Sequence, residues 1–255
     1  MLKSAKNLSR FLARCAGLEF RRLQKPKLGI DPFNDLQYFL SGITEPTVYD
    51  VGANIGQSVD RFINIFPHSR IHSFEPSPTT FEQLKVHCQR HSNVSAWNLG
   101  IGSSDGALEF IENIHSDMSS FLLPSKLAWG EVTNKVNTEV TTIDTFSKGR
   151  NIEYIHILKS DTQGFDFEVF KGAEEMMSEN RIGLIYFEFI FADMYQNLPS
   201  FDQVFRYLTD NGFLLVSFYG FHFQNDLASW TDAIFISSSF YKKRLEMDLE
   251  SSKLI

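Results

Sequence analysis

The chain has 255 residues, 43% of them hydrophobic, which is enough for one α/β domain with a substantial core. Its formal net charge of -7 argues against a nucleic-acid binder, because such proteins present a strongly basic surface. Two cysteines, Cys15 and Cys88, cannot build a disulfide framework, so we expect a reducing compartment and a cytoplasmic location.

Residues 1–27 are predicted to form a basic arm in front of an acidic body. They carry eight lysines or arginines and a single acid, Glu19. Apolar residues recur there at helical spacing, namely Leu2, Ala5, Leu8, Leu12, Cys15 and Leu18. The pattern predicts an amphipathic helix that packs on the domain, stays solvated, or lies peripherally on an anionic membrane surface. The acid-poor composition also resembles that of a mitochondrial transit peptide.

Residues 28–255 are predicted to form one domain in which strands and helices alternate. Strands are expected at 47–51, 70–74, 94–99, 107–111, 139–143, 154–160, 182–189, 213–219 and 233–237, and helices at 57–66, 79–91, 166–177 and 201–211. This alternation predicts a doubly wound, mostly parallel sheet, and the last two strands predict an antiparallel pair on it. Residues 113–137 lack a periodic pattern, which is typical of a lid or binding loop.

The segment after the first predicted strand combines Asp50, Gly52, Asn54 and Gly56 and opens a helix. In a doubly wound sheet such turns lie at the carboxyl ends of strands, where ligands bind. The glycines permit close backbone approach, and the first helical amides are unpaired donors with a partial positive charge. Glu75 ends the second predicted strand, where a carboxylate accepts hydrogen bonds from both hydroxyls of a ribose. These residues predict a site for a nucleoside with an anionic tail.

Two kinds of nucleoside cofactor suit such a site, a dinucleotide such as NAD and S-adenosylmethionine (SAM). A dinucleotide fingerprint requires G-x-G-x-x-G, whereas this loop has Gly52, Asn54 and Gln57 at the three glycine positions. Asn54 replaces the glycine that allows close approach to a pyrophosphate, so the loop disfavours a dinucleotide. The sequence also contains no G-x-x-x-x-G-K-[ST] phosphate-binding loop.

The sequence Val-Tyr-Asp-Val-Gly-Ala-Asn-Ile-Gly-Gln at 48–57 resembles the first motif of class I methyltransferases, in the form that the FkbM family uses. Later segments resemble the same family in the same order, namely 74–76, 98–102, 105–106, 141–144, 159–164 with Glu168, and 171–173. The family pattern has an aliphatic residue where Ser160 lies and commonly a glutamate where Gln163 lies. This chain therefore has a neutral side chain at a position where the family often has a carboxylate.

The resemblance implies a Rossmann-like fold that binds SAM across the carboxyl edge of the sheet. Gly52, Asn54 and Gly56 would surround the methionine part of SAM, and Glu75 would bind its ribose. The loop after the third strand, which contains Gly100, Ile101 and Gly102, would lie beside the adenine.

Asp161 is the leading candidate for an active-site carboxylate, because it ends a predicted strand at the same sheet edge as the cofactor loop. It can orient the amino group of SAM, accept a substrate proton, or bind a metal; alternatively it is an N-cap of the next helix. Glu188 ends an apolar strand, so it is expected to face a cleft or to form a salt bridge. His222 follows the next-to-last strand and is a third candidate base. No residue cluster completes a ligand set, so no metal site is expected.

The resemblance implies a SAM-dependent methyltransferase, and the expected acceptor is a hydroxyl on a sugar, a glycan or a lipid-linked glycan. The alternatives are O- or N-methylation of a diffusible small molecule, and a SAM-binding protein without catalysis. Trp129, inside the irregular stretch 113–137, offers a face on which a sugar or another ring can stack.

Overall fold

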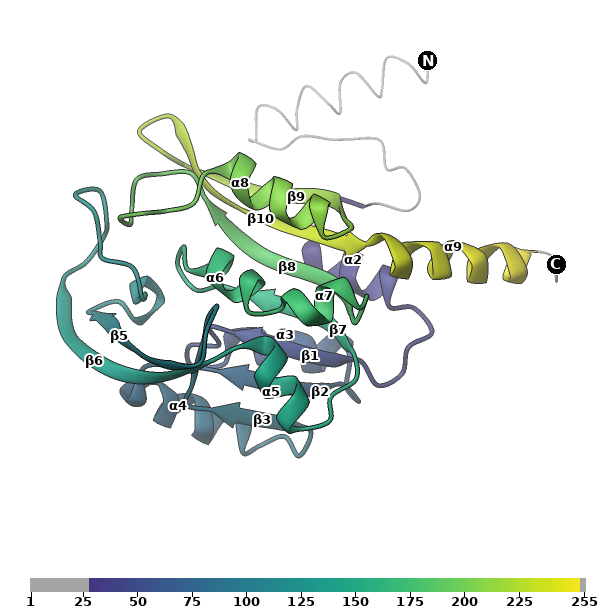
Figure 1. Cartoon of the computed structure of the whole chain (residues 1–255), viewed down its shortest axis with the longest axis horizontal. Helices are drawn as coiled ribbons and strands as arrows, with labels where there is room; N and C mark the ends of the chain where they lie inside the picture. The colour runs from purple at the N-terminus through teal and green to yellow at the C-terminus, as the bar shows by residue number, and fades with distance from the viewer. Residues whose placement is uncertain (1–27, 253–255) are drawn as a thin grey trace, which may run out of the picture.

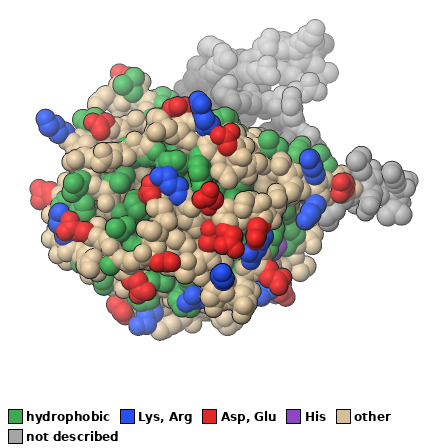
Figure 2. Space-filling model, viewed as in Figure 1, with side chains coloured by type: hydrophobic (Ala, Val, Ile, Leu, Met, Phe, Trp, Pro, Cys, Tyr) green, Lys and Arg blue, Asp and Glu red, His purple; other side chains and the backbone are tan. Residues whose placement is uncertain are grey.

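The computed structural model describes residues 28–252, so the predicted basic arm at 1–27 lies outside the described residues. Figure 1 shows a central sheet with helices on both of its faces. On the face of the molecule seen in Figure 2, acidic and basic side chains are interspersed. Within residues 28–252, no helix combines the length and the apolar character that crossing a membrane requires.

The main sheet has seven strands in the order β3-β2-β1-β7-β8-β10-β9. Their bounds are β1 (Thr47–Val51), β2 (Arg70–Phe74), β3 (Val94–Trp97), β7 (Ile155–Ser160), β8 (Ile182–Ile190), β9 (Phe213–Gln224) and β10 (Leu227–Ser237). The first five named are parallel, and β10 runs antiparallel to both β8 and β9. This confirms the predicted doubly wound sheet with its antiparallel pair. The strand order reverses between β1 and β7, which is where such folds bind ligands.

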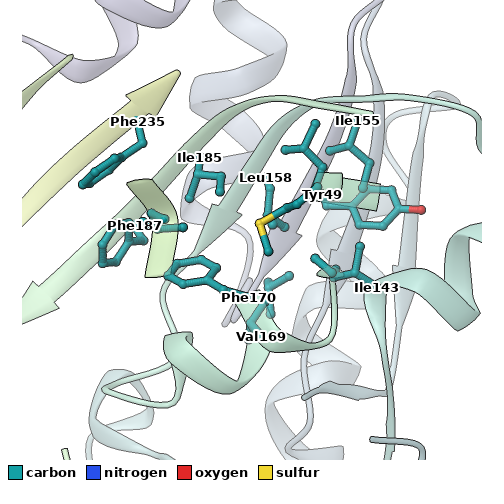
Figure 3. Close-up of a cluster of buried hydrophobic side chains, with 14 of the residues drawn as sticks. Tyr49, Ile143, Ile155, Leu158, Val169, Phe170, Ile185, Phe187 and Phe235 are labelled. Atoms are coloured by element: carbon teal, nitrogen blue, oxygen red, sulfur yellow. The ribbon is translucent and has the colours of Figure 1, made fainter. Parts of the chain in front are cut away.

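Helices bury both faces of this sheet. The helices on one face are α2 (Pro32–Phe39), α3 (Gln57–Ile65) and α4 (Pro78–Cys88), and those on the other are α5 (Ile143–Gly149), α6 (Asp166–Lys171), α7 (Glu174–Ser178) and α8 (Phe201–Asp210). Successive strand residues alternate between the two layers, so Val48 packs with α2 and α3, whereas Tyr49 packs with α5 and α6. Figure 3 shows this second layer, with Phe170 of α6 beside Phe187 of β8. A last helix, α9 (Ser238–Ser252), follows β10.

The single helix predicted at 166–177 is wrong, because α6 and α7 are separated at Gly172 and Ala173. A Cβ at Gly172 would lie 2.0 Å from the carbonyl oxygen of Gly102. The chain therefore passes another backbone too closely for any side chain, and the helix breaks there. The helical spacing of the apolar residues carries no information about this contact.

Part of the stretch predicted as irregular, residues 113–137, has a defined structure. β4 (Gly100–Ile101), β5 (Gly106–Asn113) and β6 (Val132–Thr141) form a second sheet in the order β4-β6-β5, and a short 3₁₀ helix, η1 (Ser116–Met118), follows β5. The prediction of a strand at 139–143 is wrong at both ends, since β6 begins earlier and Ile143 opens α5. Most of β6 is exposed, so apolar patterning could not reveal it. Residues 114–131 include η1 and are otherwise irregular. We call them the connecting segment.

The two C-terminal strands are longer than predicted and form one hairpin. Asn225 and Asp226 have positive φ angles, 49° and 66°, and Gln224 pairs with Leu227 across them. Two successive left-handed residues are typical of the tight turns that join antiparallel strands. His222, expected after the strand, therefore lies within β9 and pairs with Trp230 of β10.

Candidate active site

The turn between β1 and α3 forms the floor of the candidate site. Its residues Gly52, Asn54 and Gly56 all have left-handed φ angles, 74°, 49° and 104°. A Cβ at Gly52 would lie 2.0 Å from the carbonyl oxygen of Asp161, so only glycine fits where the turn passes the end of β7. The amides of Gly52 and Ala53 both donate to the carbonyl oxygen of Phe74, at 3.0 and 2.9 Å. These contacts fix the turn against β2 and β7.

Glu75 lies immediately after β2, with 6% of its surface exposed. One carboxylate oxygen accepts from the amide of Asn54 at 3.0 Å, and the other accepts from the amide of Ser77 at 2.9 Å. Burial raises the pKa of Glu75 to about 7, although these two amides oppose the rise. Each oxygen keeps a second acceptor position, so the side chain is oriented and still able to bind two donors.

A cleft lies over this turn at the carboxyl edge of the sheet. Its volume is about 590 Å³ with its open mouth included. Phe110 and Phe121 give it an apolar side. The predicted cofactor residues that line it are Gly52, Asn54, Glu75, Gly100, Ile101 and Asp161. We call it the cofactor cleft.

The other three predicted cofactor residues support the cleft from outside its lining. Asp50 is fully buried, and its carboxylate accepts from the Ser58 hydroxyl at 3.0 and 2.9 Å. Gly56 is the N-cap of α3, where a Cβ would lie 2.8 Å from the His87 ring. Gly102 is the residue whose carbonyl oxygen meets the break after α6.

A buried lysine that the sequence-based prediction does not include joins these parts. The ammonium of Lys159 lies 3.0 Å from Asp50, 3.7 Å from Asp161 and 3.2 Å from the carbonyl oxygen of Gly52. Burial lowers the pKa of Lys159, but the two carboxylates outweigh burial and hold it above its ordinary value. The lysine is therefore charged and ties the turn to the end of β7. A lysine inside the apolar strand 155–160 was a signal that this position has a buried partner.

A second cleft of about 970 Å³, again with its open mouth included, adjoins the cofactor cleft. Asp117, Asp161 and Gln163 line both. Asp117 comes from η1, and the neighbouring Ser116 hydroxyl donates to the Asn54 side chain at 3.0 Å. The connecting segment thus contacts the cofactor turn and forms part of both walls. We call the second space the acceptor cleft.

Asp161 lies at the junction of the two clefts. Its side chain is 42% exposed, and one carboxylate oxygen is held 3.7 Å from the Lys159 ammonium. α6 begins at Asp166 and has Phe165 as its N-cap, so the alternative reading of Asp161 as a helix cap is wrong. Its place and accessibility leave it free to contact molecules in either cleft.

Gln163 links the two candidate carboxyl groups. Its side-chain amide donates to Asp161 at 3.3 Å and to Glu188 at 3.1 Å. The hydroxyl of Tyr195 donates to the side-chain oxygen of Gln163 at 3.0 Å, which fixes the orientation of the amide. Gln163 is neutral, and its side-chain amide donates one hydrogen bond to each of the two acidic groups that it separates.

Glu188 lies near the end of β8 and lines the acceptor cleft. Of the two expectations for this residue, facing a cleft or forming a salt bridge, the first is confirmed. Burial raises its pKa well above the usual range, and Asp161 and Asp232 raise it further. Asp232 lies directly opposite Glu188 in the register of β8 with β10. The raised pKa favours the protonated form of Glu188, which can donate a hydrogen bond as well as accept one.

His222 lines neither cleft. It is exposed on β9, and its ring is parallel to Trp230 with 5.0 Å between ring centroids.

Among the described residues, no group of three His, Cys, Asp or Glu side chains is arranged to hold a metal ion. Tyr195 and Trp230 gave no local signal in the sequence, because their partners lie on other elements.

Residues 50–215 match the family described as the methyltransferase FkbM domain. The 2-O-methyltransferase NoeI of Sinorhizobium fredii is 22% identical over 181 residues, which cover 63% of this chain and 74% of NoeI. Methyltransferase 1 of Beauveria bassiana is 26% identical over 145 residues, which cover 50% of this chain and 58% of that protein. The structure of M. capricolum TrmK with S-adenosylhomocysteine has a TM-score of 0.46 at 7% identity and covers 81% of this chain and 67% of TrmK. The family match spans more than half of the chain, which therefore belongs to the FkbM methyltransferases and uses SAM as its methyl donor.

Proposed function

We propose that this methyltransferase acts on a hydroxyl oxygen of a sugar, and that the acceptor binds in the acceptor cleft. The observation that carries this proposal is the shared wall of the two clefts, formed by Asp117, Asp161 and Gln163. Methyl transfer gains much of its rate from holding the reacting atoms about 3–3.5 Å apart and in line. Two adjoining clefts at one sheet edge provide for such an arrangement.

The residues of the cofactor cleft fit SAM. The bound donor supplies a methyl group on a positively charged sulfur, which makes that carbon open to attack. Glu75 has one free acceptor position on each oxygen for the two ribose hydroxyls. Phe110 and Phe121 offer an apolar surface to the adenine, and Gly52 and Asn54 bring the backbone turn to the methionine part.

Asp161 is the proposed base, because it is accessible, lies at the junction of the two clefts and directly follows β7, the strand beside the cofactor turn. It accepts the proton that the acceptor hydroxyl loses as the new O–C bond forms. Lys159 holds this carboxylate in place from 3.7 Å. Glu188 is protonated because its pKa is raised, and it donates a hydrogen bond to an oxygen of the sugar that receives the methyl group. His222 lines neither cleft, so we assign it no part in the proton transfer.

Two observations support a sugar hydroxyl as the acceptor. NoeI, a relative of this chain, is named a 2-O-methyltransferase, which favours oxygen over nitrogen as the accepting atom. The acceptor cleft also combines three carboxyl groups and one amide, from Asp117, Asp161, Glu188 and Gln163. Such groups bind the many hydroxyls of a sugar, each of which needs a partner when it leaves water.

The test uses the full chain, SAM with a labelled methyl group, and a set of oligosaccharides and glycolipids. We expect the label in an O-methyl sugar. Asp161→Asn should slow this transfer by about 10²–10⁴-fold, whereas Asp193→Asn, which changes an exposed acid outside both clefts, should leave it unchanged. Label found only in nitrogen-methylated or non-sugar products would overturn the sugar assignment. Failure of the chain to bind S-adenosylhomocysteine in calorimetry would refute the assignment of the cofactor cleft.

A further inference from the structure

We infer that the acceptor cleft is a saccharide subsite in which Trp129 and Trp230 contact the apolar face of a pyranose ring. The cleft admits neutral and amino-bearing sugars and rejects phosphorylated ones. This inference rests on the proposed function. It adds the two tryptophans that contact the acceptor, and it adds that the acceptor is neutral or positively charged.

Two tryptophans from distant parts of the chain meet in this cleft. Trp129 belongs to the connecting segment and Trp230 to β10, and their ring centroids lie 5.5 Å apart at an interplanar angle of 84°. The rings therefore form a right-angled corner. His222 stacks on Trp230 and supports it, and the side-chain amide of Asn113 donates to the carbonyl oxygen of Trp129 at 2.9 Å.

The corner is placed where a ligand can reach it. Trp129 is 48% exposed and lines the same cleft as Asp161 and Glu188. A large exposed aromatic side chain beside carboxyl groups suits a ligand with one apolar face and a polar rim. A pyranose has this form, because its C–H groups gather on one face and its hydroxyls project around the ring. The apolar face loses water against the tryptophans, and the hydroxyls find partners on the carboxyl groups.

The charge of the cleft decides which sugars fit. Its described lining includes the acids Asp117, Asp161 and Glu188, a single histidine, His115, and no lysine or arginine. Sites for phosphate use guanidinium groups, ammonium groups or unpaired backbone amides, whereas a phosphate placed here would face the carboxyl groups of Asp117 and Asp161. Lys159 does not offset this, because it lies outside the lining and already pairs with Asp50 at 3.0 Å. A neutral hydroxyl or an ammonium group meets no such repulsion.

The test measures sugar binding to the full chain loaded with S-adenosylhomocysteine, after calorimetry has shown that this product binds. The probes are methyl glycosides of glucose, galactose, mannose and glucosamine, and the 6-phosphates of the same sugars. Saturation-transfer NMR is expected to show at least one glycoside receiving magnetisation mainly through the C–H groups of one ring face. The corresponding 6-phosphate should bind about tenfold more weakly or not at all.

Three variants separate ring stacking from a general effect on the fold. Trp129→Ala should weaken glycoside binding about tenfold, and Trp129→Phe should retain part of it, while both bind S-adenosylhomocysteine as the parent does. Phe223→Ala is the matched control, because Phe223 is 65% exposed on the same hairpin and lies outside the cleft lining. It should leave glycoside binding unchanged.

The inference is overturned if no glycoside binds, if Trp129→Ala binds the glycosides as well as the parent does, or if the 6-phosphates bind equally well. Each of these outcomes is scored on protein that has S-adenosylhomocysteine bound, so none of them bears on the cofactor cleft. A failure of the proposed function looks different, because the chain would then not bind S-adenosylhomocysteine or would methylate no sugar.

Discussion

The binding of S-adenosylhomocysteine should depend on pH through Glu75. Burial raises the pKa of this carboxyl to about 7, and its two oxygens are proposed to accept from the ribose hydroxyls. The ionised carboxylate accepts both hydrogen bonds, whereas the protonated form has an O–H that competes with one of them. The ionised fraction rises from about one tenth at pH 6 to about nine tenths at pH 8. Affinity should therefore rise about tenfold over that interval.

Calorimetry at several pH values tests this, with Glu75→Gln as the variant and Glu109→Gln as the control. Glu109 is exposed and pairs with Lys135, so its replacement should keep the parent profile. Glu75→Gln should bind more weakly at pH 8 and show a flat profile, once the titration of the ligand itself, common to all three proteins, is subtracted. A parent whose affinity falls as pH rises, or a variant that keeps the parent slope, would refute the reasoning.

Three further outcomes are expected. Asp161→Asn should lower kcat by about 10²–10⁴-fold, and a normal kcat in the labelled-methyl assay would contradict its role as base. Glu188→Gln should cost less than about tenfold in kcat/KM at pH 7, because the native carboxyl is already neutral; a loss as large as that of Asp161→Asn means that Glu188 ionises in the reaction. Gly172→Ala should destabilise the protein by about 1–3 kcal/mol in thermal unfolding, because the new Cβ would meet the carbonyl oxygen of Gly102. Gly149→Ala should not destabilise it, because a Cβ at Gly149 has no atom within 4 Å, and equal Tm values for the two variants would count against the contact.

Features that depend on short stretches of chain were predictable from the sequence. The turn at 52–56, the acid at Glu75 and the β–α alternation all arise from residues close together in the chain, and the structure has them where the patterns indicate. Local signals are reliable here because the conformation of a tight turn and the exposure of alternate strand residues depend on the nearest residues. The same signals predicted that Asp161 and the turn would share a sheet edge, since parallel strands end at one edge.

The contacts that complete the site join residues far apart in the chain, and only the tertiary structure reveals them. Lys159 reaches Asp50 across two neighbouring strands, and Trp129 meets Trp230 although 101 positions separate their numbers in the sequence. The break at Gly172 likewise depends on where a distant backbone passes. The sequence by itself determined the fold class through its local patterns, and the methyl donor through its resemblance to the FkbM family. The acceptor cleft was decided by folding, because its walls come from four parts of the chain that no local pattern relates, namely the connecting segment, residues 161–163, residues 188–194 and Trp230.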